Sequence, residues 1–241
     1  MARRESGFSM VELLIVLIII LVISGAIFQT INLTTQRSSA EQTRVDMFQE
    51  AREFMDQMSR DLRQAGYPNP RNMDPAVFTV LTLMPPKPIS YDHHAGAGLV
   101  KVDTGDLWFE GDVDGTGTVS VVRYHLDSDG TNCPCLKRSQ LPKIDANPLT
   151  GQTTEVYQVE VQGVQNTNIF SAYNNGTALG LPVTTSVGSS LASVDTVQAV
   201  LTLQAPTVDP QTRKKPLTTL VSTVRLNNCS QAAIGYKTSC Q

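Results

Sequence analysis

An uninterrupted apolar segment near the N-terminus constrains this chain more than any other feature. Residues 13–23 include no polar side chain, and the wider stretch 8–28 contains 21 residues. A helix of about 20 residues crosses the ~30 Å hydrocarbon core of a bilayer. The sequence therefore predicts one membrane-spanning helix, and it contains no second apolar stretch of this length. Arg3 and Arg4 precede the span, so the positive-inside rule places that end in the cytoplasm and the residues after 28 outside it.

Two general explanations fit the apolar segment. It resembles an ordinary secretory signal, for which Ser24-Gly25-Ala26 would supply the small-residue cleavage site, and it also fits an uncleaved signal anchor. Neither explains Glu12, because a carboxylate costs roughly 2.5–3.5 kcal/mol at the centre of a membrane span and less near the interface. Glu12 therefore requires a partner, most simply a positive charge at the same depth.

Composition narrows the class of protein further. The 241 residues carry a formal net charge of −3, and 41% of them are hydrophobic. These values exclude a disordered acidic tail, a collagen and a polytopic membrane protein. Basic residues are spread thinly, so no nucleic-acid partner is inferred. The length predicts one domain of ordinary size with an extended element.

The apolar segment continues into an amphipathic one. No glycine or proline occurs between Ala26 and Gly66, which predicts one helix from near Met10 to Ala65, ended by Gly66 and Pro68. Charged residues cover one face of the outer half. The opposite face is predicted to form a single apolar stripe that packs on the rest of the protein. Its members are Val45, Phe48, Ala51, Met55, Met58 and Leu62.

Beyond residue 70 the hydrophobic period changes from 3.6 to 2, which predicts strands. The expected strands are residues 78–83, 106–109, 118–126, 156–164, 196–204 and 219–226. Residues 166–193 are polar and are expected to form a long surface loop. The predicted fold class is α+β, a long N-terminal helix packed against a mostly antiparallel β-sheet head. The chain is predicted to divide into a leader peptide (residues 1–7), the membrane-spanning half of the helix (8–28), the amphipathic half of the helix (29–65) and the β-rich head (66–241).

The residues from Gly7 to Leu13, Gly-Phe-Ser-Met-Val-Glu-Leu, followed by the aliphatic run, resemble the N-terminal signal of type IV pilins and type II secretion pseudopilins. The resemblance implies a pilin-like fold, cleavage after Gly7 by prepilin peptidase on the cytoplasmic side, and methylation of the new N-terminal Phe8. It also implies that Glu12 directs assembly. Cleavage would create an ammonium group at Phe8, which Glu12 of the same or a neighbouring subunit would neutralise in low dielectric.

The end of the predicted helix, residues 60–68, resembles that of PilW-type minor pilins. This resemblance implies a minor subunit that acts in initiation and tip assembly of a type IV pilus, with other major and minor pilins as partners. The precursor would lie in the inner membrane with its head outside the cytoplasm, and the mature form would lie in the pilus at the cell surface. Two alternatives stay open: a minor pseudopilin of type II secretion, and a secreted or periplasmic β-domain with an ordinary signal peptide.

Four cysteines offer disulfides, which export favours. They are Cys133, Cys135, Cys229 and Cys240, and four cysteines allow three connectivities. A bridge between Cys229 and Cys240 would resemble the C-terminal disulfide loop of many pilins. Cys133-Pro-Cys135 would then form a tight bridge or pair elsewhere. A metal or redox site at Cys-Pro-Cys is the alternative, although no Cys/His pair at zinc spacing accompanies it.

An acidic segment resembles a calcium-binding loop. Glu110, Asp112, Asp114 and Thr116 present oxygen ligands at alternating positions, with Gly115 at the turn. The match to an EF-hand is partial, because Val121 stands where that loop has its last glutamate. The alternative is a hairpin turn, which Asp-Gly between two alternating runs also predicts. No cofactor is required, and calcium is the one candidate.

Histidines and serines give no catalytic arrangement. Asp92-His93-His94 lies in a loop rich in proline and glycine, where adjacent histidines are more often solvated residues than metal ligands. No Gly-x-Ser-x-Gly elbow follows a predicted strand, and no phosphate-binding glycine loop opens a helix. We therefore expect no enzymatic activity.

Overall fold

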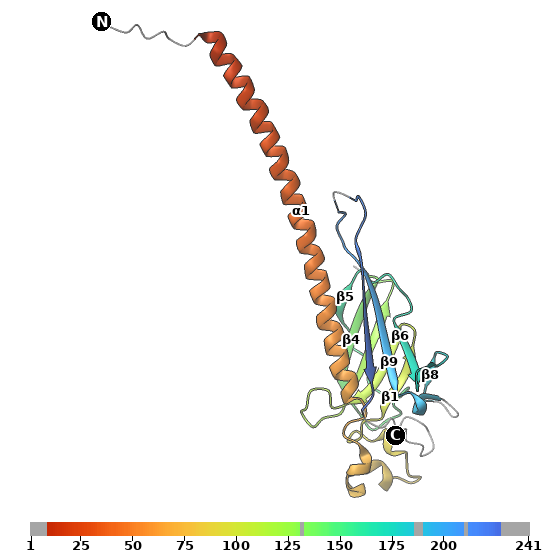
Figure 1. Ribbon diagram of the computed structural model, residues 1–241. Helices are drawn as coiled ribbons and strands as arrows, with labels where there is room; N and C mark the ends of the chain where they lie inside the picture. Colours follow the sequence, from red (N-terminus) through yellow and green to blue (C-terminus); the bar gives the residue numbers. More distant parts are fainter. Residues whose placement is uncertain (1–8, 131–132, 186–189, 210–211, 228–241) are drawn as a thin grey trace. The chain divides into compact units, whose positions relative to one another are not determined.

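The computed structural model describes residues 9–130, 133–185, 190–209 and 212–227 (Figure 1). Two compact units divide the chain. The first comprises Met1–Asp46 with Pro206–Pro216, and the second comprises Met47–Ala205 with Leu217–Gln241. The globular head belongs to the second unit, so its core is described within that unit.

The predicted long helix is confirmed. Helix α1 runs over Met10–Gln64, a length of 55 residues. It ends where the sequence predicts, because Gly66 adopts the left-handed region at φ 80°. The Gly66 N–H donates to the carbonyl oxygen of Glu110 at 2.8 Å, which ties the end of the helix to the head.

The buried face of α1 is rotated from the predicted stripe. Ala51, Met55, Met58 and Leu62 are buried as expected, and Met47 and Phe54 join them. Val45 and Phe48 are instead 47% and 37% exposed, so their inclusion in the stripe was wrong. With about 100° between successive residues, Val45 points roughly a third of a turn away from the centre of the buried face.

Two antiparallel sheets form the head (Figure 1). The larger has the strand order β5-β4-β3-β2-β1-β8, and the smaller has the order β10-β9-β6-β7. The larger sheet contains β1 (Gly98–Asp103), β2 (Asp106–Gly111), β3 (Ser120–Asp127), β4 (Cys135–Pro142), β5 (Gln158–Gln162) and β8 (Val183–Thr184). The smaller contains β6 (Phe170–Asn174), β7 (Thr177–Ala178), β9 (Thr196–Gln204) and β10 (Leu217–Arg225). Short 3₁₀ helices are η1 (Pro70–Asn72), η2 (Pro75–Val77), η3 (Thr79–Thr82), η4 (Ile89–Tyr91) and η5 (Ser190–Ser193).

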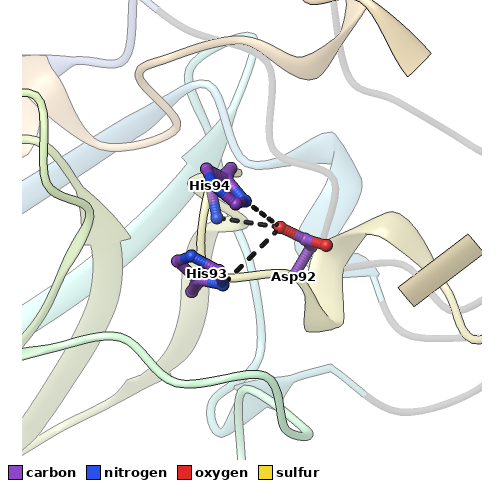
Figure 2. Close-up of side chains that lie close together, drawn as sticks. All are labelled: Asp92, His93 and His94. Atoms are coloured by element: carbon purple, nitrogen blue, oxygen red, sulfur yellow. Dashed lines mark hydrogen bonds and ion pairs between the residues drawn. The ribbon is translucent and has the colours of Figure 1, made fainter. Parts of the chain in front are cut away.

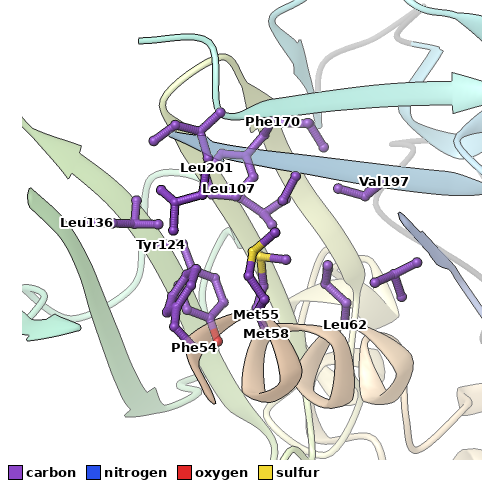
Figure 3. Packing of buried hydrophobic residues seen from close by; sticks show 14 of the residues in the cluster. Phe54, Met55, Met58, Leu62, Leu107, Tyr124, Leu136, Phe170, Val197 and Leu201 are labelled. Atoms are coloured by element: carbon purple, nitrogen blue, oxygen red, sulfur yellow. The ribbon is translucent and has the colours of Figure 1, made fainter. Parts of the chain in front are cut away.

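One hydrophobic cluster joins the outer end of α1 to both sheets (Figure 3). The ring of Phe54 meets that of Tyr124 from β3 edge-on, with centroids 5.4 Å apart. Leu201 from β9 and Phe170 from β6 belong to the same cluster. The predicted packing of the helix against the β-sheet head is thus confirmed.

The strand predictions were right for β2, β3, β5, β9 and β10, wrong at two places, and omitted β1 and β4. Residues 78–83 form η3 and its flanks instead of a strand. The Thr79 hydroxyl and the Val80 N–H both donate to the Asp92 carboxylate at 3.1 Å, which holds this turn in place. The predicted loop 166–193 contains β6, β7, β8 and η5. Ile169, Phe170, Val183 and Leu191 from this segment are buried in the core, whereas Leu179 and Leu181 are only partly buried.

Replacing Met58 by alanine tests the buried face. Met58 is 0% exposed, and truncating such a residue costs about 2–5 kcal/mol of unfolding free energy through lost burial and the cavity left behind. Val45→Ala, at an exposed position of the same helix, should change the free energy of unfolding by less than about 0.5 kcal/mol. Chemical denaturation of both variants in detergent measures the difference, and equal effects would contradict the packing.

Candidate functional site

The first half of α1 presents an uncovered apolar surface. Every hydrophobic side chain from Met10 to Ile23 is at least 46% exposed. Within the described residues α1 is the one helix long and apolar enough to cross a membrane, and none of its most apolar window is buried. Water disfavours such a surface by about 25 cal/mol per Å², so lipid or other apolar helices must cover it.

Glu12 lies in the first turn of α1, on this apolar half. The helix begins there with the Leu13 N–H donating to the Ser9 carbonyl at 3.2 Å. A carboxylate in the first turn interacts favourably with the helix dipole. Gly7 and Phe8, the predicted cleavage and methylation positions, lie outside the described residues, so both roles stay predictions.

The acidic segment connects β2 to β3 as an antiparallel hairpin, the alternative to a calcium loop. Its carboxylates accept hydrogen bonds from the loop itself: Asp112 from the N–H groups of Thr116 and Gly117, at 3.1 and 2.9 Å, and Asp114 from the Thr116 hydroxyl at 2.7 Å. Glu110 is 0% exposed within β2 and pairs with Lys143. The structure thus separates Glu110 from the loop carboxylates, and calcium binding by the remaining oxygens stays a prediction.

Cys133 and Cys135 form a disulfide, which is the tight bridge considered from the sequence. A disulfide leaves no thiolate for a metal, so the metal alternative at Cys-Pro-Cys has no support. Cys229 and Cys240 lie outside the described residues, and their pairing stays a prediction.

Comparison with known proteins addresses the N-terminal segment. A family model described as the prokaryotic N-terminal methylation motif matches residues 2–28. No curated protein and no solved structure matches the chain. The match covers the basic leader, Gly7-Phe8, Glu12 and the apolar half of α1.

The N-terminal segment of this chain is similar to that of type IV pilin-like proteins. The N-terminal methylation motif, an exposed apolar helix and an α+β head occur together in this chain. The apolar half of α1, which the motif covers, is long and apolar enough to anchor the chain in a membrane. The motif does not distinguish PilW-type minor pilins from other members.

Two histidines of the head, His93 and His94, are hydrogen-bonded to aspartates, whereas the sequence predicts solvated side chains. The Nδ1 atoms of His93 and His94 lie 2.7 Å from Asp145 and 2.8 Å from Asp92, respectively. Burial alone would raise the pKa of the Asp92 carboxyl, but hydrogen bonds from His94, Val80 and Thr79 outweigh it and lower the pKa to about 2. Asp145, which organises His93, carries no local sequence signal, because it is 52 residues away from that histidine.

A buried ion pair also escaped sequence reasoning. Lys143 and Glu110 are each 0% exposed at the side chain, and their charged atoms lie 2.6 Å apart. The Lys143 ammonium also donates to the carbonyl oxygens of Ser90 and Ala95, both at 2.7 Å, while Glu110 accepts the Ala97 N–H. These bonds fix the segment that carries the histidines against the end of β4.

A second polar network joins α1 to the larger sheet. The Tyr124 hydroxyl donates to Asp61 at 2.7 Å, and Arg138 donates to the same carboxylate at 2.8 Å. Asp61 is therefore satisfied on the buried face of the helix. The network fixes the rotation of the outer helix on the pilin-like head.

Asp106 lies between two cations on the larger sheet. Arg123 contacts it with two nitrogens at 2.7 and 3.0 Å, and Lys101 contacts it at 2.8 Å. Burial alone would raise the pKa of Asp106, but the hydrogen bonds from Arg123 and Lys101 outweigh it and lower the pKa below its ordinary value. This contribution to stability is fully present at pH values above the ordinary aspartate pKa. It is lost as the pH falls through the lowered pKa of Asp106.

Asp106→Asn should therefore lower the free energy of unfolding at pH 7 by about 1.5–3 kcal/mol, the range for hydrogen bonds to charged groups. The difference from wild type should shrink as the pH falls through the lowered pKa of Asp106, because the wild-type carboxylate is then itself protonated. Denaturation at a series of pH values measures this. Asp103→Asn, which removes a more exposed partner of Lys101, is the control and should cost less than about 1 kcal/mol. An unchanged difference at low pH would contradict the assignment.

Proposed function

We propose that this chain is a minor subunit of a type IV pilus. Its leader is removed after Gly7 by prepilin peptidase, Phe8 is methylated, and the mature subunit takes part in initiation at the tip of the filament. Other major and minor pilins are its partners through α1. The precursor lies in the inner membrane with its head outside the cytoplasm, and the mature form lies in the pilus at the cell surface.

The single observation that carries this proposal is the coincidence of the methylation motif with the exposed half of α1. The motif spans residues 2–28, and the hydrophobic side chains of the same segment are exposed. A membrane can cover this surface before assembly, and apolar helices of neighbouring subunits can cover it afterwards. One surface then serves both the membrane-held precursor and the filament.

Glu12 supplies specificity to this assembly. In a filament core its carboxylate requires a cation at the same depth, and the α-amino group of mature Phe8 is that cation in the proposed process. Shifting two helices by one turn would separate the charges, so the pair favours one axial register. The carboxylate and the leader thus act together, because removal of the leader creates the amino group.

A minor pseudopilin of type II secretion is the alternative within the same family, since the motif is common to both machines. An ordinary secreted β-domain is less consistent with the structure. Cleavage near Ser24-Gly25-Ala26 would cut within α1, which continues without interruption from Met10 to Gln64.

Deletion of the gene in its native host distinguishes the two machines. The proposal expects surface fibres to be lost while secretion of exported enzymes continues, with fibres restored by the wild-type chain. Loss of secretion with normal fibres would assign the chain to type II secretion. Unchanged fibres and unchanged secretion would contradict both assignments.

A further inference from the structure

A cluster of two histidines and two aspartates lies in the head, apart from α1 and the methylation motif. Asp92, His93 and His94 follow η4, and Asp145 comes from the segment after β4. Figure 2 shows both imidazole rings turned toward the Asp92 carboxylate. The rings lie beside each other, with centroids 3.8 Å apart.

The ligand atoms of the cluster converge on a small volume. The Oδ1 atom of Asp92 is 2.8 Å from Nδ1 of His94 and 4.0 Å from Nδ1 of His93. One ligand atom from each of these three residues lies within 4.8 Å of the other two. Asp145 is next in reach, because its Oδ1 is 2.7 Å from Nδ1 of His93.

Contacts outside this volume hold the carboxylates in place. The Thr79 hydroxyl lies 3.1 Å from Oδ2 of Asp92 and 3.2 Å from Oδ2 of Asp145, and the Val80 N–H donates to Oδ2 of Asp92 at 3.1 Å. The Oδ2 atoms therefore bind the surroundings, while the Oδ1 atoms face the imidazoles and also accept backbone N–H groups, Asp145 from His93 at 2.7 Å and Asp92 from His94 at 3.0 Å. Hydrogen-bonded carboxylates of this kind are typical of metal sites, whose ligands are oriented by an outer layer of partners.

We propose that Asp92, His93, His94 and Asp145 bind a zinc-class divalent cation. Two imidazole nitrogens and two carboxylate oxygens make a four-ligand set of the type that Zn²⁺ accepts in tetrahedral geometry. The imidazoles exclude calcium and magnesium as the preferred ions, since both prefer oxygen ligands. Two carboxylates neutralise the dication, which the 0% exposed side chain of Asp92 requires.

Tetrahedral geometry requires the side chains to move, Asp145 most of all, because its oxygens do not lie within 4.8 Å of the ligand atoms of all three other residues. Metal–ligand bonds of about 2.0–2.1 Å place neighbouring ligand atoms of a tetrahedron about 3.3–3.4 Å apart. Nδ1 of His93 is 2.7 Å from Oδ1 of Asp145 and 4.0 Å from Oδ1 of Asp92, and Nδ1 of His94 is 2.8 Å from Oδ1 of Asp92. These separations lie on both sides of the tetrahedral value. His93, His94 and Asp145 are 43%, 37% and 42% exposed, so an ion can enter from solvent and these side chains can adjust.

Zinc binding by the full-length chain in detergent tests the proposal. The protein is produced without a histidine tag, stripped with a chelator, dialysed against zinc chloride and analysed for zinc per chain. The expected result is one zinc ion per chain. X-ray absorption at the zinc edge should show only nitrogen and oxygen neighbours, with the scattering pattern of imidazole.

Variants locate the site. His94→Gln should weaken zinc binding by more than about 100-fold, and Thr79→Val, which removes an outer partner, by about 10–100-fold. His125→Gln is the matched control, because His125 lies on β3 beside Asp106 and outside the cluster. It should bind zinc as the wild type does. Circular dichroism in the presence of chelator checks that each variant is folded.

Three results would overturn the proposal. One is wild-type zinc no higher than in a matched detergent blank, which would leave the cluster as hydrogen-bonded His–Asp pairs. Another is equal zinc affinity in folded His94→Gln and wild type. The third is sulfur scattering at the zinc edge, which would place the ion at cysteines. The wild-type measurements decide the matter even where a variant does not fold.

Discussion

Glu12→Ala is expected to reduce the share of this protein in sheared pili at least about tenfold, while its amount in the membrane is unchanged. The head does not contain Glu12, so the variant should fold and insert. In the filament, however, the ammonium group of mature Phe8 would lose its partner in low dielectric, and an unpaired buried charge costs several kcal/mol. A loss of only about 1.4 kcal/mol suffices for a tenfold change. Quantitative immunoblots of sheared and membrane fractions measure the ratio.

Glu41→Ala is the matched control for this experiment. It removes a carboxylate from an exposed position of the same helix, beyond the apolar half. It should leave the share of the protein in pili within about twofold of wild type. Normal incorporation of Glu12→Ala, or equal losses in the two variants, would contradict the role given to Glu12.

Lys143→Met is expected to destabilise the head by about 3–5 kcal/mol, the cost of breaking a buried ion pair by removing one partner. The variant leaves Glu110 as a carboxylate with a 0% exposed side chain and without its cation. Burial already raises the pKa of Glu110, with Lys143 opposing that rise, so the variant should raise this pKa further. Denaturation at pH 7 measures the loss.

A double variant separates charge from packing. Glu110→Gln in the Lys143→Met background removes the uncompensated charge and keeps an acceptor for the Ala97 N–H, which Glu110 holds at 3.1 Å. It should recover part of the stability lost in the single variant. Glu110→Gln alone should lower the free energy of unfolding less than Lys143→Met does. The Lys143 ammonium keeps its hydrogen bonds to the carbonyl oxygens of Ser90 and Ala95 in that variant. A double variant less stable than Lys143→Met would contradict this account.

The helix was predictable because its signals are local. Apolar periodicity, the absence of glycine and proline over forty residues and the Gly66 stop all act within a few turns of each other. The exact buried face was less predictable, since Val45 and Phe54 both fit an apolar pattern. Contact with the head is made by Phe54, whose ring meets that of Tyr124, whereas Val45 is 47% exposed.

The head was predictable only where strands alternate clearly. Strand β9 matches its expected bounds because its apolar residues alternate with polar ones over nine residues. Strand β4 was missed because Lys137, Arg138 and Gln140 obscure the alternation of apolar and polar residues. Arg138 nevertheless has a structural role, because it donates hydrogen bonds to Asp61 and Tyr124. The polar pairs join residues that are far apart in the chain, as Lys143 with Glu110 and Asp145 with His93. Tertiary contacts, which a single sequence does not display, create these sites.

The mature N-terminus of the protein, taken from membrane and sheared-surface fractions of the native host, tests the central claim most directly. Mass spectrometry of the N-terminal peptide should show a chain that begins at Phe8 and carries one methyl group on its α-amino nitrogen. An unmodified chain that begins at Ile27 would contradict the claim and indicate an ordinary secreted domain. A chain that retains residues 1–7 in both fractions would contradict prepilin processing.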